Sequence, residues 1–343
     1  MQKRILAAVV ASMMAGQAMA VTVFDNGTDK VTIGGHVGMR YVDQDNGDTA
    51  GDSSRINFGF EHKLTQDTTA FARAEWGFDV TKTNGEVFNN RLGYVGVKND
   101  QFGSVTFGKA WSSYGKVAGW TDSFATTGGE ASGYYGADGH VLGTARADDV
   151  LQYNHSIMGL NISAQVQLGE GDFAGNNRDS SYGIAASYEL PMGLSIGAAY
   201  NQADVEAATD YKAKSAVVGV KFETDKIYAA LTFADLENRT LFSETAAGVT
   251  RNVRAHDATG IELYASYQLN DMFKVEGGYN QLEGERNGVD LEQEVKYFPV
   301  AVVYTQGPVQ LSGTYQFEKS TKVVDGETVD VDDKIILQAR YYF

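Results

Sequence analysis

The chain contains no cysteine, and only 3 of its 343 residues are proline. Because no disulfide can form, the stability of the fold must come from other interactions. Proline is confined to strand edges and turns, so its scarcity suits a chain of long strands. The abundant residues agree: 39 glycines, 19 tyrosines and 17 phenylalanines describe a chain rich in tight turns and strand-forming residues.

Basic residues are also in short supply. There are 28 lysines and arginines against 44 aspartates and glutamates, which gives a formal net charge of −16. Nucleic acid is therefore a poor candidate partner, because its recognition needs a basic surface. Cations and cationic solutes are better candidates for an acidic protein.

Long apolar runs are absent after the first twenty residues, so no helical membrane span is predicted. The opening stretch, MQKRILAAVVASMMAGQAMA, has a basic start, an apolar middle and a small-residue end, which are the three parts of a secretory signal peptide. Its apolar middle, about eleven residues, is too short to cross roughly 30 Å of hydrocarbon as a helix. We therefore expect residues 1–20 to be a cleaved signal peptide and residues 21–343 to form a single domain.

Apolar and polar residues alternate along the rest of the chain. In RINFGFEHKL, for example, Ile56, Phe58 and Phe60 alternate with Arg55 and Asn57. Period-two alternation is typical of strands with one apolar face, whereas a helix needs apolar residues three and four apart. Sixteen such strands are predicted, at 30–42, 53–65, 68–81, 89–98, 103–110, 146–155, 160–168, 181–190, 193–201, 213–223, 226–234, 259–269, 272–281, 293–304, 309–317 and 334–343.

The connections between these segments alternate strictly between short and long. Short connections, with turn residues, are predicted near 66–67, 99–102, 156–159, 191–192, 224–225, 270–271 and 305–308. Long connections, rich in Asp, Glu, Asn, Gly and Thr, are predicted at 43–52, 82–88, 111–145, 169–180, 202–212, 235–258, 282–292 and 318–333. Connections that alternate in this way join consecutive strands in an up-and-down topology. Both termini then lie on the side of the short turns.

Sorted loops favour a membrane barrel over a soluble sandwich. Membrane barrels have short periplasmic turns, long external loops, lipid-facing apolar residues and a polar interior. The polar faces here carry Arg, Glu, Lys, Asn and Gln, which is too much polarity for a packed core. We therefore predict an all-β fold, a 16-stranded antiparallel transmembrane β-barrel with a water-filled lumen. Since lipid tolerates no open strand edge, the last strand, ending at Phe343, must pair with the first, near 30–42.

Five features together resemble those of the general diffusion porins of the Gram-negative outer membrane. These features are the signal peptide, the first strand KVTIGGHVGMRYV, the segment NNRLGYVGVKNDQFGSVTFGKAWSSYG, the long third loop and the terminal Phe343. The resemblance implies a homotrimer in outer-membrane lipid and lipopolysaccharide that passes small hydrophilic solutes and ions. It also implies that the outer-membrane assembly machinery reads the terminal strand, in which Tyr341 and Phe343 form the signal. No cofactor and no metal are expected.

The resemblance further implies that the third loop, 111–145, folds into the barrel and narrows the pore. Asp122 and Glu130 fall where the family places loop carboxylates that face a basic wall. The family's Pro-Glu-Phe-Gly-Gly-Asp signature is Ala-Thr-Thr-Gly-Gly-Glu here, so Thr126 stands where the key glutamate is expected. The constriction should therefore differ somewhat from that of the family.

The opposing basic wall is predicted from two sources. The first is strand parity, the rule that alternate residues of a strand lie on the same face. It places Arg40, Arg55 and Arg73 on lumen faces, and His36 shares the face of Arg40. The resemblance adds Lys109 and Arg146. Parity argues against Lys109 and also against Arg91, because both fall on the face of their apolar neighbours. Opposed charges across a narrow aqueous gap create a transverse field that favours polar solutes, and the acidic balance suggests modest cation selectivity.

Three other functions compete with general diffusion. A substrate-specific porin for sugars or peptides is the main alternative, and the third-loop residues Tyr134 and Tyr135 could either stack on a sugar ring or pack the loop against the wall. An outer-membrane hydrolase needs a nucleophile or an acid/base set. No such set is recognisable, so no enzymatic activity is expected. Adhesion or receptor use of the long loops could coexist with transport.

Overall fold

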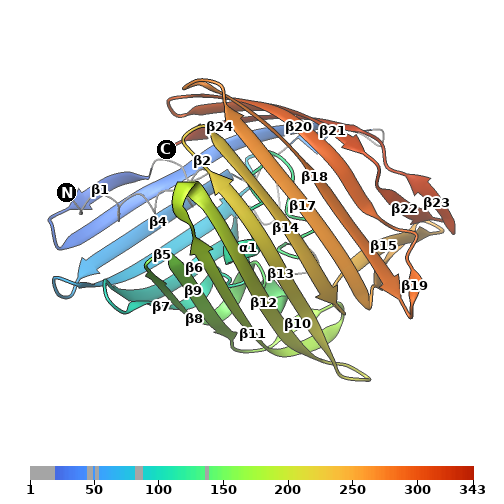
Figure 1. The fold of residues 1–343 in the computed structure, drawn as a ribbon, viewed down its shortest axis with the longest axis horizontal. Helices are drawn as coiled ribbons and strands as arrows, with labels where there is room; N and C mark the ends of the chain where they lie inside the picture. Colours follow the sequence, from blue (N-terminus) through green and yellow to red (C-terminus); the bar gives the residue numbers. More distant parts are fainter. Residues whose placement is uncertain (1–19, 45–48, 51–53, 82–87, 136–138) are drawn as a thin grey trace.

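The computed structural model describes residues 20–44, 49–50, 54–81, 88–135 and 139–343. The predicted signal peptide therefore lies outside the described residues, except for Ala20. Antiparallel strands wind around a hollow interior, and the chain runs in sequence order around the ring (Figure 1). None of the helices in the described part of the chain is long and apolar enough to cross a membrane.

Sixteen long strands form the barrel, which confirms the predicted fold class. They are β2 (Asp29–Asp43), β4 (Ser54–Lys63), β5 (Thr68–Phe78), β6 (Phe88–Asn99), β7 (Gly103–Trp111), β8 (Arg146–Ile157), β9 (Leu160–Gln167), β11 (Asn176–Glu189), β12 (Leu194–Glu206), β13 (Tyr211–Glu223), β14 (Ile227–Glu237), β17 (Asp257–Gln268), β18 (Phe273–Arg286), β20 (Val295–Gln306), β21 (Val309–Glu318) and β24 (Lys334–Tyr342).

Shorter elements lie at the chain start and in the connections. They are β1 (Val21–Asp25), β3 (Thr49–Ala50), α1 (Gly115–Ala118), α2 (Gly139–Leu142), β10 (Gly171–Phe173), the 3-10 turn η2 (Pro191–Gly193), β15 (Leu241–Ala246), β16 (Val249–Arg254), β19 (Val289–Asp290), β22 (Thr321–Val324) and β23 (Glu327–Asp330).

The barrel closes between its first and last strands, as predicted. Antiparallel pairing runs from His36 opposite Tyr342 to Asp43 opposite Ile335. Beyond β24, the backbones of Gly35 and Phe343 exchange two hydrogen bonds, of 3.0 and 3.1 Å. The short strand β1, which the sequence did not reveal, continues this closure along the remaining edge of β2. Between Val31 and Asp43, the backbone along this edge of β2 is therefore paired with other strands, apart from one or two residues. It does not need water to satisfy its hydrogen bonds.

The two faces of the barrel wall differ in polarity. Large apolar side chains are exposed on the outside, among them Val37, Met39 and Tyr41 on β2. Polar side chains point inward and are buried, such as Gln165 and Asn201. This arrangement is the reverse of a soluble core and suits a wall with lipid outside and water inside.

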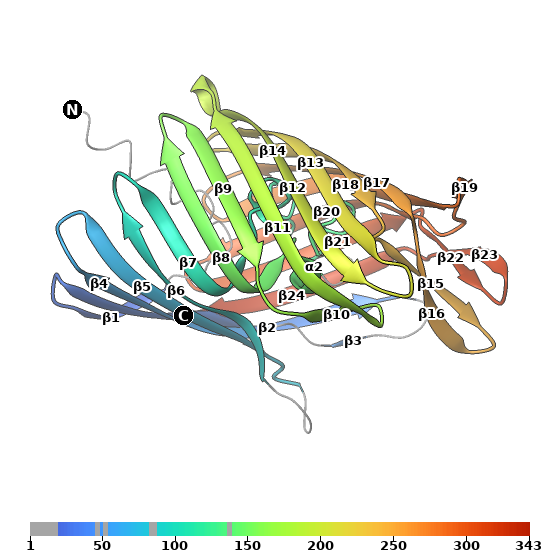
Figure 2. The ribbon, with the colours of Figure 1, turned by 90° about the horizontal axis from the view of Figure 1, so that it is seen from below.

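The connections follow the predicted alternation, with one clear difference. The predicted long loop 202–212 is wrong in length, because β12 and β13 extend to leave only 207–210 between them. Two other long connections contain hairpins, β15–β16 and β22–β23, which join into a four-stranded sheet through parallel pairing of Glu244 with Val323. Both hairpins project from the same end of the barrel (Figure 2).

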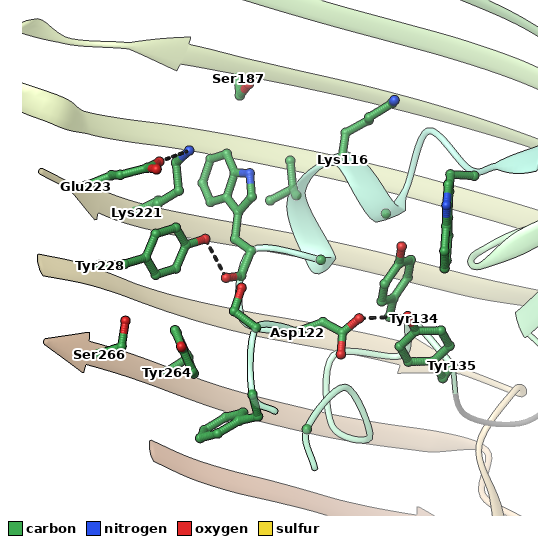
Figure 3. A pocket seen from close by; sticks show the side chains of 18 of the residues that line it. Lys116, Asp122, Tyr134, Tyr135, Ser187, Lys221, Glu223, Tyr228, Tyr264 and Ser266 are labelled. Atoms are coloured by element: carbon green, nitrogen blue, oxygen red, sulfur yellow. Dashed lines mark hydrogen bonds and ion pairs between the residues drawn. The ribbon is translucent and has the colours of Figure 1, made fainter. Parts of the chain in front are cut away.

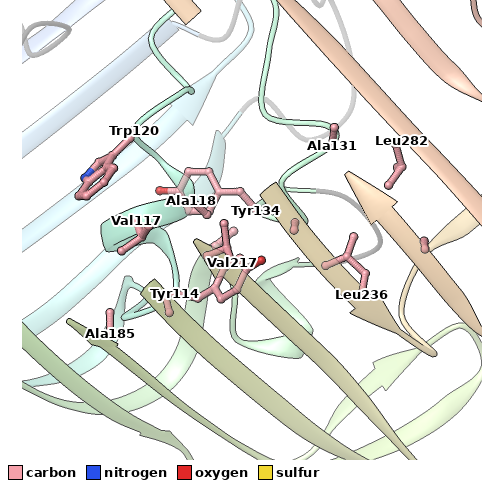
Figure 4. Close-up of a cluster of buried hydrophobic side chains, with 14 of the residues drawn as sticks. Tyr114, Val117, Ala118, Trp120, Ala131, Tyr134, Ala185, Val217, Leu236 and Leu282 are labelled. Carbon is pink, nitrogen blue, oxygen red and sulfur yellow. The ribbon is translucent and has the colours of Figure 1, made fainter. Parts of the chain in front are cut away.

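The third long connection, residues 112–145 between β7 and β8, is called L3 here. It carries α1 and α2, and α1 lies inside the ring of strands (Figures 1 and 2). Its apolar residues Tyr114, Val117 and Trp120 pack with the inner wall residues Ala199 and Val217 (Figure 4). The largest buried apolar cluster thus joins L3 to one side of the lumen, which confirms that the third loop folds into the barrel.

Candidate pore constriction

Glycines in the wall make room for L3. A Cβ atom on Gly197 of β12 would lie 2.7 Å from the Trp120 ring, and one on Gly260 of β17 would lie 1.7 Å from the Ala131 carbonyl oxygen. Side chains at these positions would therefore push L3 away from the strands. Because these glycines have no side chain, the wall from β12 to β18 has a shallow depression, and L3 lies in it. We call this depression the seat of L3.

Buried Glu262 of β17 holds the middle of L3. Its Oε1 accepts hydrogen bonds from the backbone N–H groups of Ala131 and Ser132, at 2.7 and 3.1 Å. The Thr121 hydroxyl donates to its Oε2 at 2.6 Å. One carboxylate thus satisfies three donors from two separate parts of the loop, and hydrogen bonds to a charged acceptor are among the stronger ones in proteins.

The tip of L3 is held by a second set of wall residues. The Ala125 N–H donates to Glu276 Oε1 of β18 at 2.7 Å. The hydroxyls of Thr126 and Thr314 are 2.7 Å apart, so Thr126 bonds to the barrel wall. Thr127 donates to Gln316 at 2.9 Å. L3 is therefore fixed along one side of the lumen, from β12 to β21.

The side of the lumen opposite the seat is basic. Arg40 and His36 lie on β2, and Arg55 lies on β4 directly opposite His36 in the register. The buried His36 ring packs edge-on against Tyr342 of β24, with the ring centroids 5.4 Å apart. Arg40 Nη1 lies 3.5 Å from the Thr126 carbonyl oxygen, so it reaches the tip of L3.

Arg73 and Arg91 share a carboxylate on this side. Glu75 Oε2 is 2.9 Å from Arg73 Nη2, and its Oε1 is 2.8 Å from Arg91 Nε. The period-two pattern is misleading at Arg91. A register shift between Glu75 and Trp76 pairs them with Leu92 and Asn90, so Arg91 is the extra residue of a bulge and turns inward.

Replacing Glu75 with glutamine should make the constriction more positive. The change keeps the side-chain shape but removes the negative charge between two guanidinium groups, so chloride should gain relative to potassium. The reversal potential in a KCl gradient should shift in the anion direction. The matched control is Glu61→Gln, since Glu61 pairs with Lys98 at 3.0 Å and both side chains are half exposed. A shift toward cations in Glu75→Gln would contradict this role.

Arg146 and Lys109, the wall residues suggested by the resemblance, lie where L3 meets β7 and β8. The Arg146 guanidinium lies over the Trp111 ring, 5.7 Å from its centroid. Lys109 sits in a second bulge, between Gly108 and Ala110, and its Nζ pairs with Asp148 at 2.7 Å. We call Arg40, Arg55, Arg73, Arg91 and Arg146 the arginine wall, which leaves Lys109 outside it.

The two predicted acids lie on L3. The Tyr135 hydroxyl donates to Asp122 Oδ2 at 2.7 Å (Figure 3), and the Tyr297 hydroxyl donates to Glu130. Enclosure by protein raises the pKa of Asp122 to about 7. Enclosure, and then the nearby Glu262 carboxylate, raise the pKa of Glu130 to about 7, although Glu130 still contacts the lumen. Both acids thus bond to tyrosines and titrate near neutral pH.

A cavity of about 1520 Å³ separates L3 from the basic side of the lumen. Arg40, Arg55 and Arg340 line it on one side, and Asp122 and Glu130 on the other. The two neighbouring tyrosines differ in exposure. Tyr134 is buried in the packing of L3, whereas Tyr135 is 38% exposed to the cavity. The space is open, polar and flanked by opposite charges.

The predicted assembly residues lie at the closure of the barrel. Tyr341 is exposed on the outer face of β24 and pairs with Val37 of β2. Phe343 packs against Gly35, where a Cβ atom would lie 2.9 Å from the ring. The structure therefore gives both residues a place on the lipid-facing seam, and their role as a signal stays a prediction.

A closed barrel with an apolar outer surface and a polar lumen narrowed by an inner loop defines an outer-membrane channel. A family model described as Gram-negative porin matches residues 6–322. The chain belongs to the Gram-negative porin family.

Named relatives agree with this assignment. Outer membrane protein F of Serratia marcescens is 28% identical over 338 residues, which cover 89% of this chain and 88% of that protein. Among solved structures, OmpF of Salmonella typhi in complex with daunomycin has a TM-score of 0.81 at 22% identity, covering 94% of this chain and 100% of that one. OmpT of Vibrio cholerae, in its trimer form, has a TM-score of 0.69 at 17% identity, covering 92% and 100%. The two structural likenesses show the shared fold, and the relatives place the chain in the Gram-negative outer membrane as a diffusion channel.

Proposed function

We propose that this porin passes small hydrophilic solutes and ions through the gap between L3 and the arginine wall. The observation that supports this most directly is the attachment of L3 to the β12–β21 side, which keeps the opposite side of the lumen clear. Charges of opposite sign then face each other across water, and the field between them orients polar solutes. Apolar solutes lose ordered water in this field and pass less readily.

Several finer properties belong to the same proposal. Residues 1–20 act as a cleaved signal peptide, and residues 21–343 form one barrel domain that assembles as a homotrimer in lipid and lipopolysaccharide. The trimer form of the structurally similar Vibrio cholerae protein supports the oligomer. The terminal strand is read by the outer-membrane assembly machinery. Transport is passive and the protein has no enzymatic activity, in line with the channel family to which it belongs.

Proteoliposome swelling tests general diffusion. Vesicles with the purified protein should swell in neutral sugars at rates that fall smoothly with solute size, without preference for one sugar of a given size. Rapid swelling in a single sugar would instead favour the substrate-specific alternative, which the cavity-exposed ring of Tyr135 supports. Vesicles that swell in no sugar at all would contradict an open channel.

Ion selectivity should depend on pH near neutrality. As the pH falls through about 7, Asp122 and Glu130 take up protons and lose their negative charge, so the constriction becomes more positive. The potassium-to-chloride permeability ratio should therefore decrease between pH ~9 and ~5, a window in which ordinary carboxyls stay largely ionised. Reversal potentials measure this ratio.

The control for this pH effect is the double variant Asp122→Asn, Glu130→Gln. It should lose most of the change near pH 7, while any change that remains reports histidines, the side chains that ordinarily titrate in this range. A double variant with an unaltered pH profile would show that these two acids do not set the selectivity.

A further inference from the structure

L3 carries a lysine whose ammonium group has no acidic partner. Lys116 lies in α1, lines the cavity and is partly buried. Within the described residues, no carboxylate oxygen lies within 4.0 Å of its Nζ atom, and its side chain makes no hydrogen bond. Two other lysines of the cavity are paired, Lys221 with Glu223 at 3.1 Å and Lys274 with Glu276 at 2.8 Å. Lys116 is therefore an unpaired amine inside the barrel.

Packing fixes the turn that carries Lys116. A Cβ atom on Gly197 of β12 would lie 3.0 Å from a methyl group of Val117, so the residue next to Lys116 packs directly on the wall. From this turn the Lys116 side chain projects away from Asp122 and away from the ion pair of Glu223 (Figure 3). The fold of L3 thus keeps the amine apart from both acids.

The strands behind α1 offer no free acid. α1 packs on β11, β12 and β13, and the charged groups on the lumen faces of these strands are Arg178, Glu189, Lys221 and Glu223. Glu189 Oε1 accepts a hydrogen bond from Asn161 Nδ2 at 3.3 Å, and Glu223 is bonded to Lys221. The two acids of L3 are bonded to tyrosines. Each acid around α1 therefore already has a partner.

This environment changes the chemistry of the amine. Burial lowers the pKa of Lys116, because the charged ammonium loses water and gains no counter-ion. Each unit by which a lysine pKa falls raises the neutral fraction at neutral pH about tenfold. A neutral amine carries a lone pair that attacks carbonyl carbon, as in lysines that form Schiff bases. Lys116 thus places a nucleophile beside a water-filled path.

We propose that Lys116 is a covalent modification site for small aldehydes that enter the pore. The amine nitrogen attacks the carbonyl carbon and forms a C–N bond, and the carbonyl oxygen then leaves as water with both amine hydrogens. A C=N double bond remains, nothing is oxidised or reduced, and water reverses the step. Aldehydes suit the site because they are small and hydrophilic and because the addition needs no leaving group. This inference rests on the proposed function, since the aldehyde reaches Lys116 through an open pore.

Competition between two lysines of the same cavity tests the proposal. The protein in detergent micelles is treated at neutral pH with glycolaldehyde and sodium cyanoborohydride, which reduces the imine to a stable secondary amine. Peptide mass spectrometry then measures the rate of modification at each lysine. Lys116 should react at least about tenfold faster than Lys226, which lines the same cavity but is exposed on the turn between β13 and β14. Equal rates at the two lysines, or a faster reaction at Lys226, would overturn the proposal.

A change of charge provides the second measurement. Pyridoxal 5′-phosphate brings a phosphate group with its aldehyde, and borohydride makes the product permanent. In planar bilayers this treatment should lower the single-channel current and shift the reversal potential in the cation direction, because a negative group replaces a positive one. Lys116→Gln should lose most of both changes, whereas the control Lys226→Gln should respond like the original protein.

Failure of the modification site and failure of the channel give different results. An equal response to pyridoxal 5′-phosphate in Lys116→Gln and the original protein would contradict the site, with heat-dependent gel mobility as the check that the variant barrel is folded. Normal conductance without preferential reaction at Lys116 would overturn the site and leave the channel standing. The absence of conductance before any aldehyde is added would contradict the proposed function itself.

Discussion

Replacing Glu262 with alanine should make the open channel unstable. L3 then loses the acceptor for three of its hydrogen-bond donors, and leaving such donors unsatisfied costs at least about 3 kcal/mol in total. This energy shifts the equilibrium between L3 bound to the wall and L3 released from it by more than about 100-fold. Asp122 and Glu130 on the released loop are attracted to the arginine wall, so the loop should move across the pore. We expect frequent brief closures in single-channel recordings and a lower voltage threshold for closure.

Glu262→Gln is the matched variant for this experiment. Its Oε1 can still accept from the Ala131 and Ser132 amides, so the channel should stay close to the original in noise and conductance. Both variants should keep the heat resistance of the barrel, because strand pairing on either side of β17 does not involve the carboxylate. Quiet, fully open channels in Glu262→Ala would show that L3 does not depend on this anchor.

Replacing Gly35 with alanine should weaken the closure of the barrel. A Cβ atom there would lie 2.1 Å from the Arg55 carbonyl oxygen and 2.9 Å from the Phe343 ring, so either β4 or the chain end must move. Overpacking against backbone typically costs about 1–3 kcal/mol and more when the backbone cannot yield. We expect the unfolding temperature, read from heat-dependent gel mobility, to drop by about 2–5 °C.

Gly93→Ala is the control for a glycine within a strand. Its nearest neighbour, the Asn90 side chain, would lie 3.9 Å from the new Cβ atom, so little change in the unfolding temperature is expected. Equal stability of Gly35→Ala and Gly93→Ala would mean that the contact between β2, β4 and Phe343 is not needed to close the barrel.

The strands could be predicted from sequence because lipid and water impose a period-two pattern on every one of them. The alternation in RINFGFEHKL, for instance, corresponds to β4. The pattern ends where a strand leaves the membrane, since both of its faces then meet water. The pattern therefore predicts a loop at polar residues such as Asp204 and Glu206, although they extend β12. For the same reason it gives no sign of the hairpins β15–β16 and β22–β23.

The constriction could be predicted only in part. Parity placed Arg40, Arg55 and Arg73 on the lumen side, where the structure also has them, because the strands between them are regular. The same pattern misplaces Arg91, because a bulge shifts the register by one residue and leaves no mark in the sequence. Glu262 could be assigned to a lumen face, but its role depends on the path of a loop some 130 residues earlier in the chain.

The most direct test of a pore that passes between L3 and the arginine wall uses the absence of cysteine from this chain. Asp122→Cys places a single thiol on L3 at the cavity, and Arg251→Cys places one on the exposed β16 hairpin. Current through each channel is recorded before and after a bulky, positively charged methanethiosulfonate reagent is added. We expect the reagent to reduce the current of Asp122→Cys by half or more and to leave that of Arg251→Cys nearly unchanged. An unaltered current in a fully labelled Asp122→Cys channel would mean that ions do not pass Asp122, and would contradict the proposed pathway.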